Sequence, residues 1–122
     1  MSTRLVEAAE VDDRIDDRLT RVLERSRTLG FLGPGPVTAH VEHARALLPH
    51  LEALGEGCRA LDLGSGGGVP GLVLAVALPS WRWTLLDAMQ KRTDAMRQAV
   101  DELGLAGRVE VVRQRAEVVG HD

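Results

Sequence analysis

The clearest chemical pattern in the sequence lies in residues 61–72, which read LDLGSGGGVPGL. A short apolar run ends at Leu63 and leads directly into glycines, and Pro70 follows where a helix would begin. Glycine permits sharp turns and close approach of a ligand to the backbone, because it has no Cβ. The free amide groups at a helix start favour a negatively charged ligand group. This segment predicts a strand, a ligand-binding turn and a helix.

Two cofactors could use such a turn. Gly66, Gly68 and Gly71 satisfy the dinucleotide pattern G-x-G-x-x-G, and Asp87 lies 19 residues after Gly68, where an acid could bind ribose in either case. Asp62 stands two residues before the first glycine, where a carboxylate would repel a pyrophosphate and attract an ammonium group. This spacing favours S-adenosyl-L-methionine (SAM) over NAD, and a strand, turn and helix without a ligand remains the structural alternative.

The apolar periodicity predicts the elements that must position this turn. The expected elements are helices at 2–27, 38–54, 69–78 and 88–103 and strands at 58–63, 81–86 and 108–112. Strands that alternate with helices at short spacing imply a parallel sheet with right-handed crossovers. We therefore expect a Rossmann-like α/β fold, organised as an N-terminal helical region (1–57) and a cofactor-binding region (58–122).

The composition excludes several classes of function. The 122 residues are 44% hydrophobic and 27% charged, as in an ordinary globular protein, and the net charge of −3 provides no global attraction to nucleic acid. Aromatic residues make up 2%, too few for a base-stacking surface. The single cysteine cannot form an internal disulfide, and the sequence has neither an apolar run of 18 residues nor a signal segment. We expect a cytoplasmic protein without membrane contact.

The glycine-rich segment also resembles a specific family. Residues 62–72 (DLGSGGGVPGL), 84–88 (TLLDA), 91–92 (KR) and 113–117 (RQRAE) are similar to the bacterial 16S ribosomal RNA guanine-N7 methyltransferase family, also called glucose-inhibited division protein B. The resemblance implies a class I SAM-dependent methyltransferase, of which the chain would hold the N-terminal half, truncated after the third strand. It implies ribosomal RNA as the partner.

The resemblance also implies roles for individual residues. Gly64 and Val69 match positions that line the methionine and ribose side of SAM, and Asp87 matches the acid that accepts both ribose hydroxyls. Ala116 and Glu117 match the pair that borders the adenine. The shared methyltransferase turn contributes Asp62, Gly66 and Gly68.

The resemblance gives no catalytic residue. The N7 lone pair of guanine attacks the sulfonium methyl without deprotonation, so alignment can replace a strong base. His40 and His43 could share a metal, but no third ligand stands at suitable spacing, and we expect no metal site. Six cations could form a local basic rim, although scattered surface charge is the favoured interpretation: Lys91, Arg92, Arg97, Arg108, Arg113 and Arg115.

Two alternatives to an active methyltransferase remain open. The chain could be a non-catalytic SAM-binding module, or a degenerate domain that interacts with another chain. In complete sheets of this type a fourth strand lies beside the first, so a chain without it would expose the edge of strand 58–63. We therefore expect a homodimer or a partner chain at that edge.

Overall fold

The structure is a computed structural model that describes residues 2–64 and 66–115, with side chains described from residue 15. Its elements, in chain order, are α1 (Ser2–Thr28), α2 (Val37–Arg45), α3 (Leu48–Glu52), β1 (Arg59–Leu63), α4 (Gly71–Ala77), β2 (Arg82–Asp87), α5 (Gln90–Glu102) and β3 (Val109–Arg113). The expected order of strands and helices after residue 58 is therefore confirmed.

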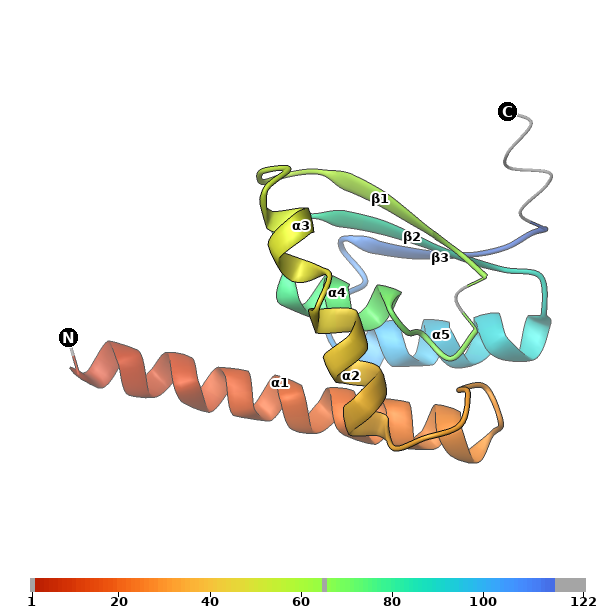
Figure 1. Cartoon of the computed structure of the whole chain (residues 1–122), viewed down its shortest axis with the longest axis horizontal. Helices are drawn as coiled ribbons and strands as arrows, with labels where there is room; N and C mark the ends of the chain where they lie inside the picture. Colours follow the sequence, from red (N-terminus) through yellow and green to blue (C-terminus); the bar gives the residue numbers. More distant parts are fainter. Residues whose placement is uncertain (1, 65, 116–122) are drawn as a thin grey trace.

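The three strands form one parallel sheet in the order β1-β2-β3, with β2 in the centre (Figure 1). Ala60 pairs with Trp83, and Trp83 pairs with Val109, so these three side chains share one face. Parallel strands must be joined by crossovers, and α4 and α5 provide them. This arrangement confirms the predicted Rossmann-like α/β fold.

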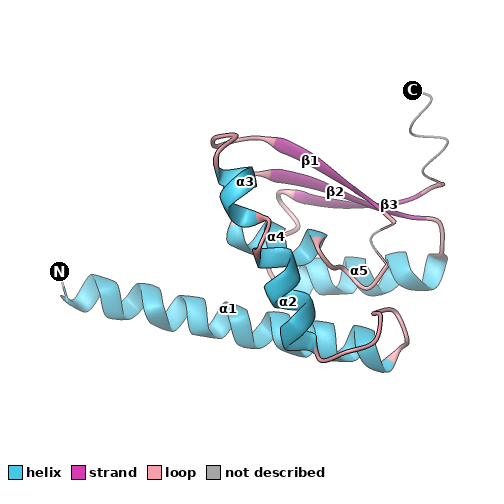
Figure 2. Cartoon of the chain, in the orientation of Figure 1, coloured by secondary structure: helices cyan, strands magenta, loops and turns pink. Residues whose placement is uncertain are grey.

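All the helices lie on one side of the sheet, as Figure 2 shows. Helices α4 and α5 pack directly against the strands, and α1 and α2 cover them from outside (Figure 1). The molecule therefore has a sheet layer, an inner helical layer and an outer helical layer. In the part of the chain that the structure describes, no helix covers the opposite face of the sheet.

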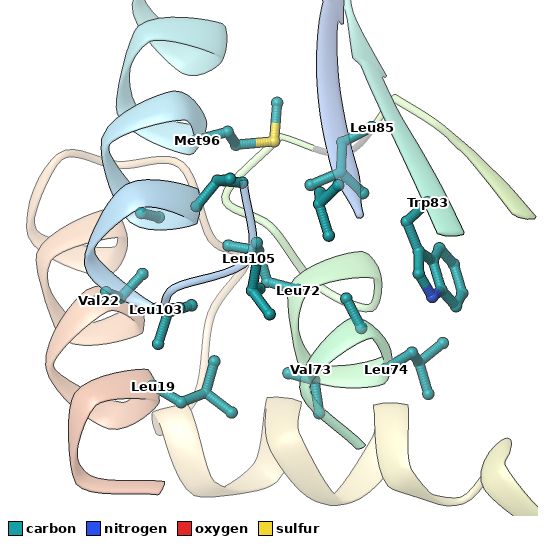
Figure 3. Packing of buried hydrophobic residues seen from close by; sticks show 14 of the residues in the cluster. Leu19, Val22, Leu72, Val73, Leu74, Trp83, Leu85, Met96, Leu103 and Leu105 are labelled. Atoms are coloured by element: carbon teal, nitrogen blue, oxygen red, sulfur yellow. The ribbon is translucent and has the colours of Figure 1, made fainter. Parts of the chain in front are cut away.

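One apolar cluster fills the space between the sheet and the helices (Figure 3). Leu72 on α4, Leu85 on β2 and Leu23 on α1 are completely buried in it. Because the chain has only three aromatic residues, aliphatic side chains provide most of this packing. The cluster includes residues from both expected regions, so the N-terminal helices share one core with the strands and helices that follow them.

The expected helix at 38–54 is wrong in one respect, because the structure divides it into α2 and α3. Pro49 stands in the first turn of α3 and has no amide hydrogen to donate to the carbonyl of Arg45. The chain turns at Ala46 and Leu47, where the Leu47 amide bonds the Ala44 carbonyl three residues back. The proline therefore ends one helix and begins the next.

Among the described residues, the outer edge of β1 and its side chains on the opposite sheet face are exposed. Leu61 and Leu63 point to that face and are 45% and 54% exposed. Leu86, which pairs with Leu63 in the sheet, is only 1% exposed. Within the described sheet, β1 bonds β2 on one side and no strand on the other.

Helix α1 is fixed to α5 by an ion pair whose strength should depend on pH. Arg25 Nη1 lies 2.8 Å from Glu102 Oε1, and this hydrogen bond lowers the pKa of the Glu102 carboxyl. A lowered pKa in the folded state stabilises the fold above the unfolded-state value, about 4.3, and this stabilisation is lost as the pH falls through the folded value. We expect urea unfolding midpoints to decrease on acidification, and Glu102→Gln to reduce that decrease. The exposed Glu110→Gln variant serves as the control, and an equal reduction in both variants would contradict the prediction.

Candidate cofactor-binding site

The carboxyl ends of the three strands meet at one edge of the sheet, at the right in Figure 1. Gly64 follows β1, Asp87 ends β2 and Gln114 follows β3. The Gln114 amide donates a hydrogen bond to the Asp87 carbonyl at 3.0 Å. A cavity of about 400 Å³ opens here, and its lining residues are Gly64, Leu86, Asp87, Ala88, Met89, Arg92, Gln114 and Arg115. In open parallel sheets, ligands bind at this end of the strands.

The Asp87 carboxylate connects the glycine turn to the start of α5. Oδ2 accepts a hydrogen bond from the Gly66 amide at 3.0 Å, and Oδ1 accepts one from the Met89 amide at 2.9 Å. The residue is 5% exposed, so these bonds satisfy a largely buried charge. Gly66 and Asp87 are 21 residues apart in the chain, and the carboxylate fixes their relative position.

The glycine turn adopts a backbone conformation that only glycine tolerates well. Gly64, Gly66 and Gly68 have φ values of +70°, +53° and +96°. Gly64 lines the cavity, and a Cβ on this residue would meet no atom within 4 Å. A side chain there would therefore occupy space that a ligand could use.

Asp62 belongs to β1, and its side chain reaches the start of α4. Its Oδ2 accepts a hydrogen bond from the Gly71 amide at 3.0 Å, and a Cβ on Gly71 would lie 2.6 Å from the same oxygen. The carboxylate thus provides negative charge at the helix N-terminus. It does not belong to the residues that line the cavity, and its contact with an ammonium group of SAM stays a prediction.

The loop between α1 and α2 contacts this turn, which sequence reasoning did not anticipate. A Cβ on Gly67 would lie 2.8 Å from the Phe31 carbonyl and 2.5 Å from Leu32 Cδ2. The Arg92 guanidinium carbon lies 5.9 Å from the centre of the Phe31 ring, and Arg92 Nη1 lies 3.8 Å from Asp87 Oδ2. The only signal in the sequence was a lone phenylalanine between glycines, because the contact joins segments far apart in the chain.

The expected site residues differ in their placement. Gly64 and Asp87 line the cavity, and Gly66 bonds Asp87. Gly68 packs against Leu72, since a Cβ would collide with that side chain, and Val69 packs against the apolar core. The Val69–Pro70 peptide bond is cis. Ala116 and Glu117 lie outside the described residues.

A second hollow, of about 330 Å³, lies at the amino ends of the strands and includes Arg59, Arg82 and Arg108. Arg108 donates to the Leu78 carbonyl at 3.2 Å. Neither the glycine turn nor Asp87 reaches this hollow. The described residues include no group of three His, Cys, Asp or Glu side chains able to hold a metal ion. Where the chain is described, none of its helices is both long and apolar enough to cross a membrane.

The parallel sheet and the cavity at the carboxyl ends of its strands are those of the class I methyltransferase fold. The structure is similar to an O-methyltransferase from Bacillus cereus in complex with SAH, with a TM-score of 0.64 and 20% identity over 93% of this chain and 55% of that chain. It is also similar to a mutant of MtNAS, with a TM-score of 0.59 and 18% identity over 84% of this chain and 42% of that chain.

Sequence comparison gives the family within this class. Residues 37–122 match the GidB family model, described as rRNA small subunit methyltransferase G. The chain is 47% identical over 87 residues to ribosomal RNA small subunit methyltransferase G of Burkholderia thailandensis, and this match covers 66% of the chain and 38% of that protein. The homologous protein of Burkholderia pseudomallei strain 668 is 47% identical over 85 residues, which cover 65% of the chain and 37% of that protein. The chain belongs to the rRNA small subunit methyltransferase G family and spans less than two fifths of the length of these curated relatives.

The close packing of Gly71 against Leu85 and Asp62 can be tested by adding one methyl group to the glycine. In Gly71→Ala the new Cβ would lie 2.5 Å from Leu85 Cδ2, so the core or the strand must shift, although alanine is the better helix former. We expect a loss of about 1–3 kcal/mol in the free energy of unfolding, measured with urea. Gly107→Ala is the matched control, because a Cβ there meets nothing within 4 Å, and its effect should stay within about 0.5 kcal/mol. Equal effects in both variants would contradict the close packing.

Proposed function

We propose that the cavity beside Asp87 binds SAM, with the Asp87 carboxylate accepting hydrogen bonds from both ribose hydroxyls. The observation that carries this proposal is the geometry of the carboxylate. A carboxylate has about four acceptor positions, and two of those on Asp87 accept the Gly66 and Met89 amides. One further position on each oxygen suits the two adjacent hydroxyls of a ribose.

The glycine turn fits the same ligand. Gly64 lines the cavity without a side chain, which leaves room for a ligand against the backbone. Asp62 supports SAM over a dinucleotide, because its carboxylate already accepts the Gly71 amide that a pyrophosphate would use. A phosphate at this position would also be repelled by the Asp62 charge.

The remaining residue roles follow from the family resemblance and are part of the proposal. Val69 would lie on the methionine and ribose side, and Ala116 and Glu117 would border the adenine. Gly66 and Gly68 would shape the turn, and Asp62 would be near the ammonium group. Residues 58–122 would form the cofactor-binding region, and residues 1–57 the helical region that supports it.

The proposed reaction is methyl transfer to N7 of a guanine in 16S ribosomal RNA, in the cytoplasm where ribosomes assemble. SAM supplies an activated methyl group when bound. The chain's own residues hold and orient the adenosine, and none needs to remove a proton, because the N7 lone pair is already available. The family membership supports this reaction and RNA partner.

Replacing Asp87 tests the cofactor site. The Asp87→Ala variant loses the acceptor of both hydroxyls, so Kd for SAM should rise by roughly 100-fold in a calorimetric titration. Asp94→Ala is the control, because Asp94 is an exposed acid of α5 that pairs with Arg97. Circular dichroism would establish that both variants fold. A folded, unaltered chain that releases no heat with SAM would contradict cofactor binding and favour the interaction-domain alternative.

We further propose that another strand, from a second copy or another chain, pairs with the β1 edge. The edge has no second partner among the described strands, and Leu61 and Leu63 expose apolar surface beside it. Unpaired strand edges promote such association, because their amide and carbonyl groups remain available.

Light scattering of the isolated chain at high concentration tests this second proposal. We expect a dimer or larger species, and Leu61→Glu should weaken the association by placing charge on the exposed face. Leu54→Glu is the control, since Leu54 is 68% exposed but lies outside the sheet. A monodisperse monomer under these conditions would contradict pairing at the β1 edge.

A further inference from the structure

The Arg92 guanidinium lies between Asp87 and Phe31, which belongs to the α1–α2 loop, here also called the N-terminal loop. Arg92 belongs to the first turn of α5, and its Cζ lies 5.9 Å from the Phe31 ring centre. Its Nη1 lies 3.8 Å from Asp87 Oδ2, and its side chain lines the cavity. A cation over an aromatic face is attracted by the ring quadrupole. Arg92 therefore contacts two groups at once.

Phe31 is itself held against the glycine turn. Its amide donates to the Ser26 carbonyl at 2.9 Å, which continues the hydrogen bonding at the end of α1. Its carbonyl would lie 2.8 Å from a Cβ on Gly67 and 3.5 Å from one on Gly66. The loop after α1 rises toward the carboxyl ends of the strands in Figure 1. The N-terminal loop thus contacts the turn directly and reaches Asp87 through Arg92.

The distance between Arg92 and Asp87 matters for ligand binding. At 3.8 Å the pair attracts by charge but is longer than a hydrogen bond, so Arg92 does not occupy an acceptor position of the carboxylate. Among the described residues, buried Arg92 Nε has no hydrogen-bond partner, so the guanidinium is held by its cation–π contact with Phe31 and by the charge of Asp87. The arrangement leaves the remaining acceptor positions of Asp87 available.

We propose that Arg92 is a positioning residue for Asp87 and that Phe31 holds Arg92 in place, so the α1–α2 loop sets the affinity of the cavity for the ribose of adenosine. This inference rests on the proposed SAM site. It gives the N-terminal loop a role in cofactor binding, although Phe31 does not line the cavity.

The test compares S-adenosylhomocysteine with its 2′-deoxy analogue by calorimetric titration of the full chain. A well-positioned Asp87 binds both hydroxyls, so the unaltered chain should prefer S-adenosylhomocysteine by roughly tenfold or more. In Arg92→Met and in Phe31→Leu, Kd for S-adenosylhomocysteine should rise by roughly 3- to 10-fold, and the preference over the deoxy analogue should fall toward one. The double variant should match Arg92→Met, because both changes remove the same contact.

Two further variants separate positioning from loss of structure or charge. Arg97→Met removes a cation of α5 that lies outside the cavity and should leave both Kd values unchanged. Arg92→Lys keeps the charge and loses the planar guanidinium, so its preference for the hydroxyl should be intermediate. Circular dichroism of each variant confirms folding, and Arg92→Lys decides the question if Phe31→Leu does not fold.

The outcomes distinguish this inference from the function on which it rests. Normal binding with an unchanged preference in Arg92→Met and Phe31→Leu overturns the positioning role alone. Equal weakening of both ligands also overturns it, because a general loss of structure or charge would act on both alike. A folded, unaltered chain that binds neither ligand overturns the proposed SAM site together with the inference.

Discussion

The arrangement of the cavity depends on the Asp87 carboxylate and on the hydrogen bonds that it accepts from two backbone amides. One oxygen holds Gly66 in the glycine turn, and the other holds Met89 before α5, so a single side chain joins the turn to the start of that helix. A charge that is 5% exposed is costly unless hydrogen bonds satisfy it. The same two bonds leave the outer acceptor positions for a ligand. The structural role of Asp87 is therefore compatible with the ligand-binding role proposed for it.

The packing of the helices supports this arrangement from one side of the sheet. Leu72 and Leu85 place α4 against β2, and the close approach of Gly71 brings the start of α4 onto Asp62. Helix α1 adds the outer layer through Leu23, and its following loop reaches the glycine turn. The site thus depends on the N-terminal helices as well as on the strands that carry it.

Sequence reasoning succeeded where the signal is local. Alternating apolar residues after Pro79 predict a strand at 81–86, within one residue of β2 at each end, because strand period and turn chemistry act over a few residues. The same approach overextended the helix through Pro49, where a missing amide hydrogen outweighs the apolar spacing. The cation–π contact of Arg92 with Phe31 could not be predicted, because tertiary packing brings together residues that no periodicity relates. The contact of Asp62 with the Gly71 amide likewise required the helix to be placed.

The most direct test of a cofactor site centred on Asp87 is an amide NMR spectrum of the labelled chain titrated with S-adenosylhomocysteine. Ligand hydroxyls on the carboxylate would alter the hydrogen bonds that it accepts, so the Gly66 and Met89 amides should show the largest shifts. Gly107, in the hollow at the amino ends of the strands, should stay unchanged. Large shifts at Gly107 with none at Gly66 and Met89 would contradict this account.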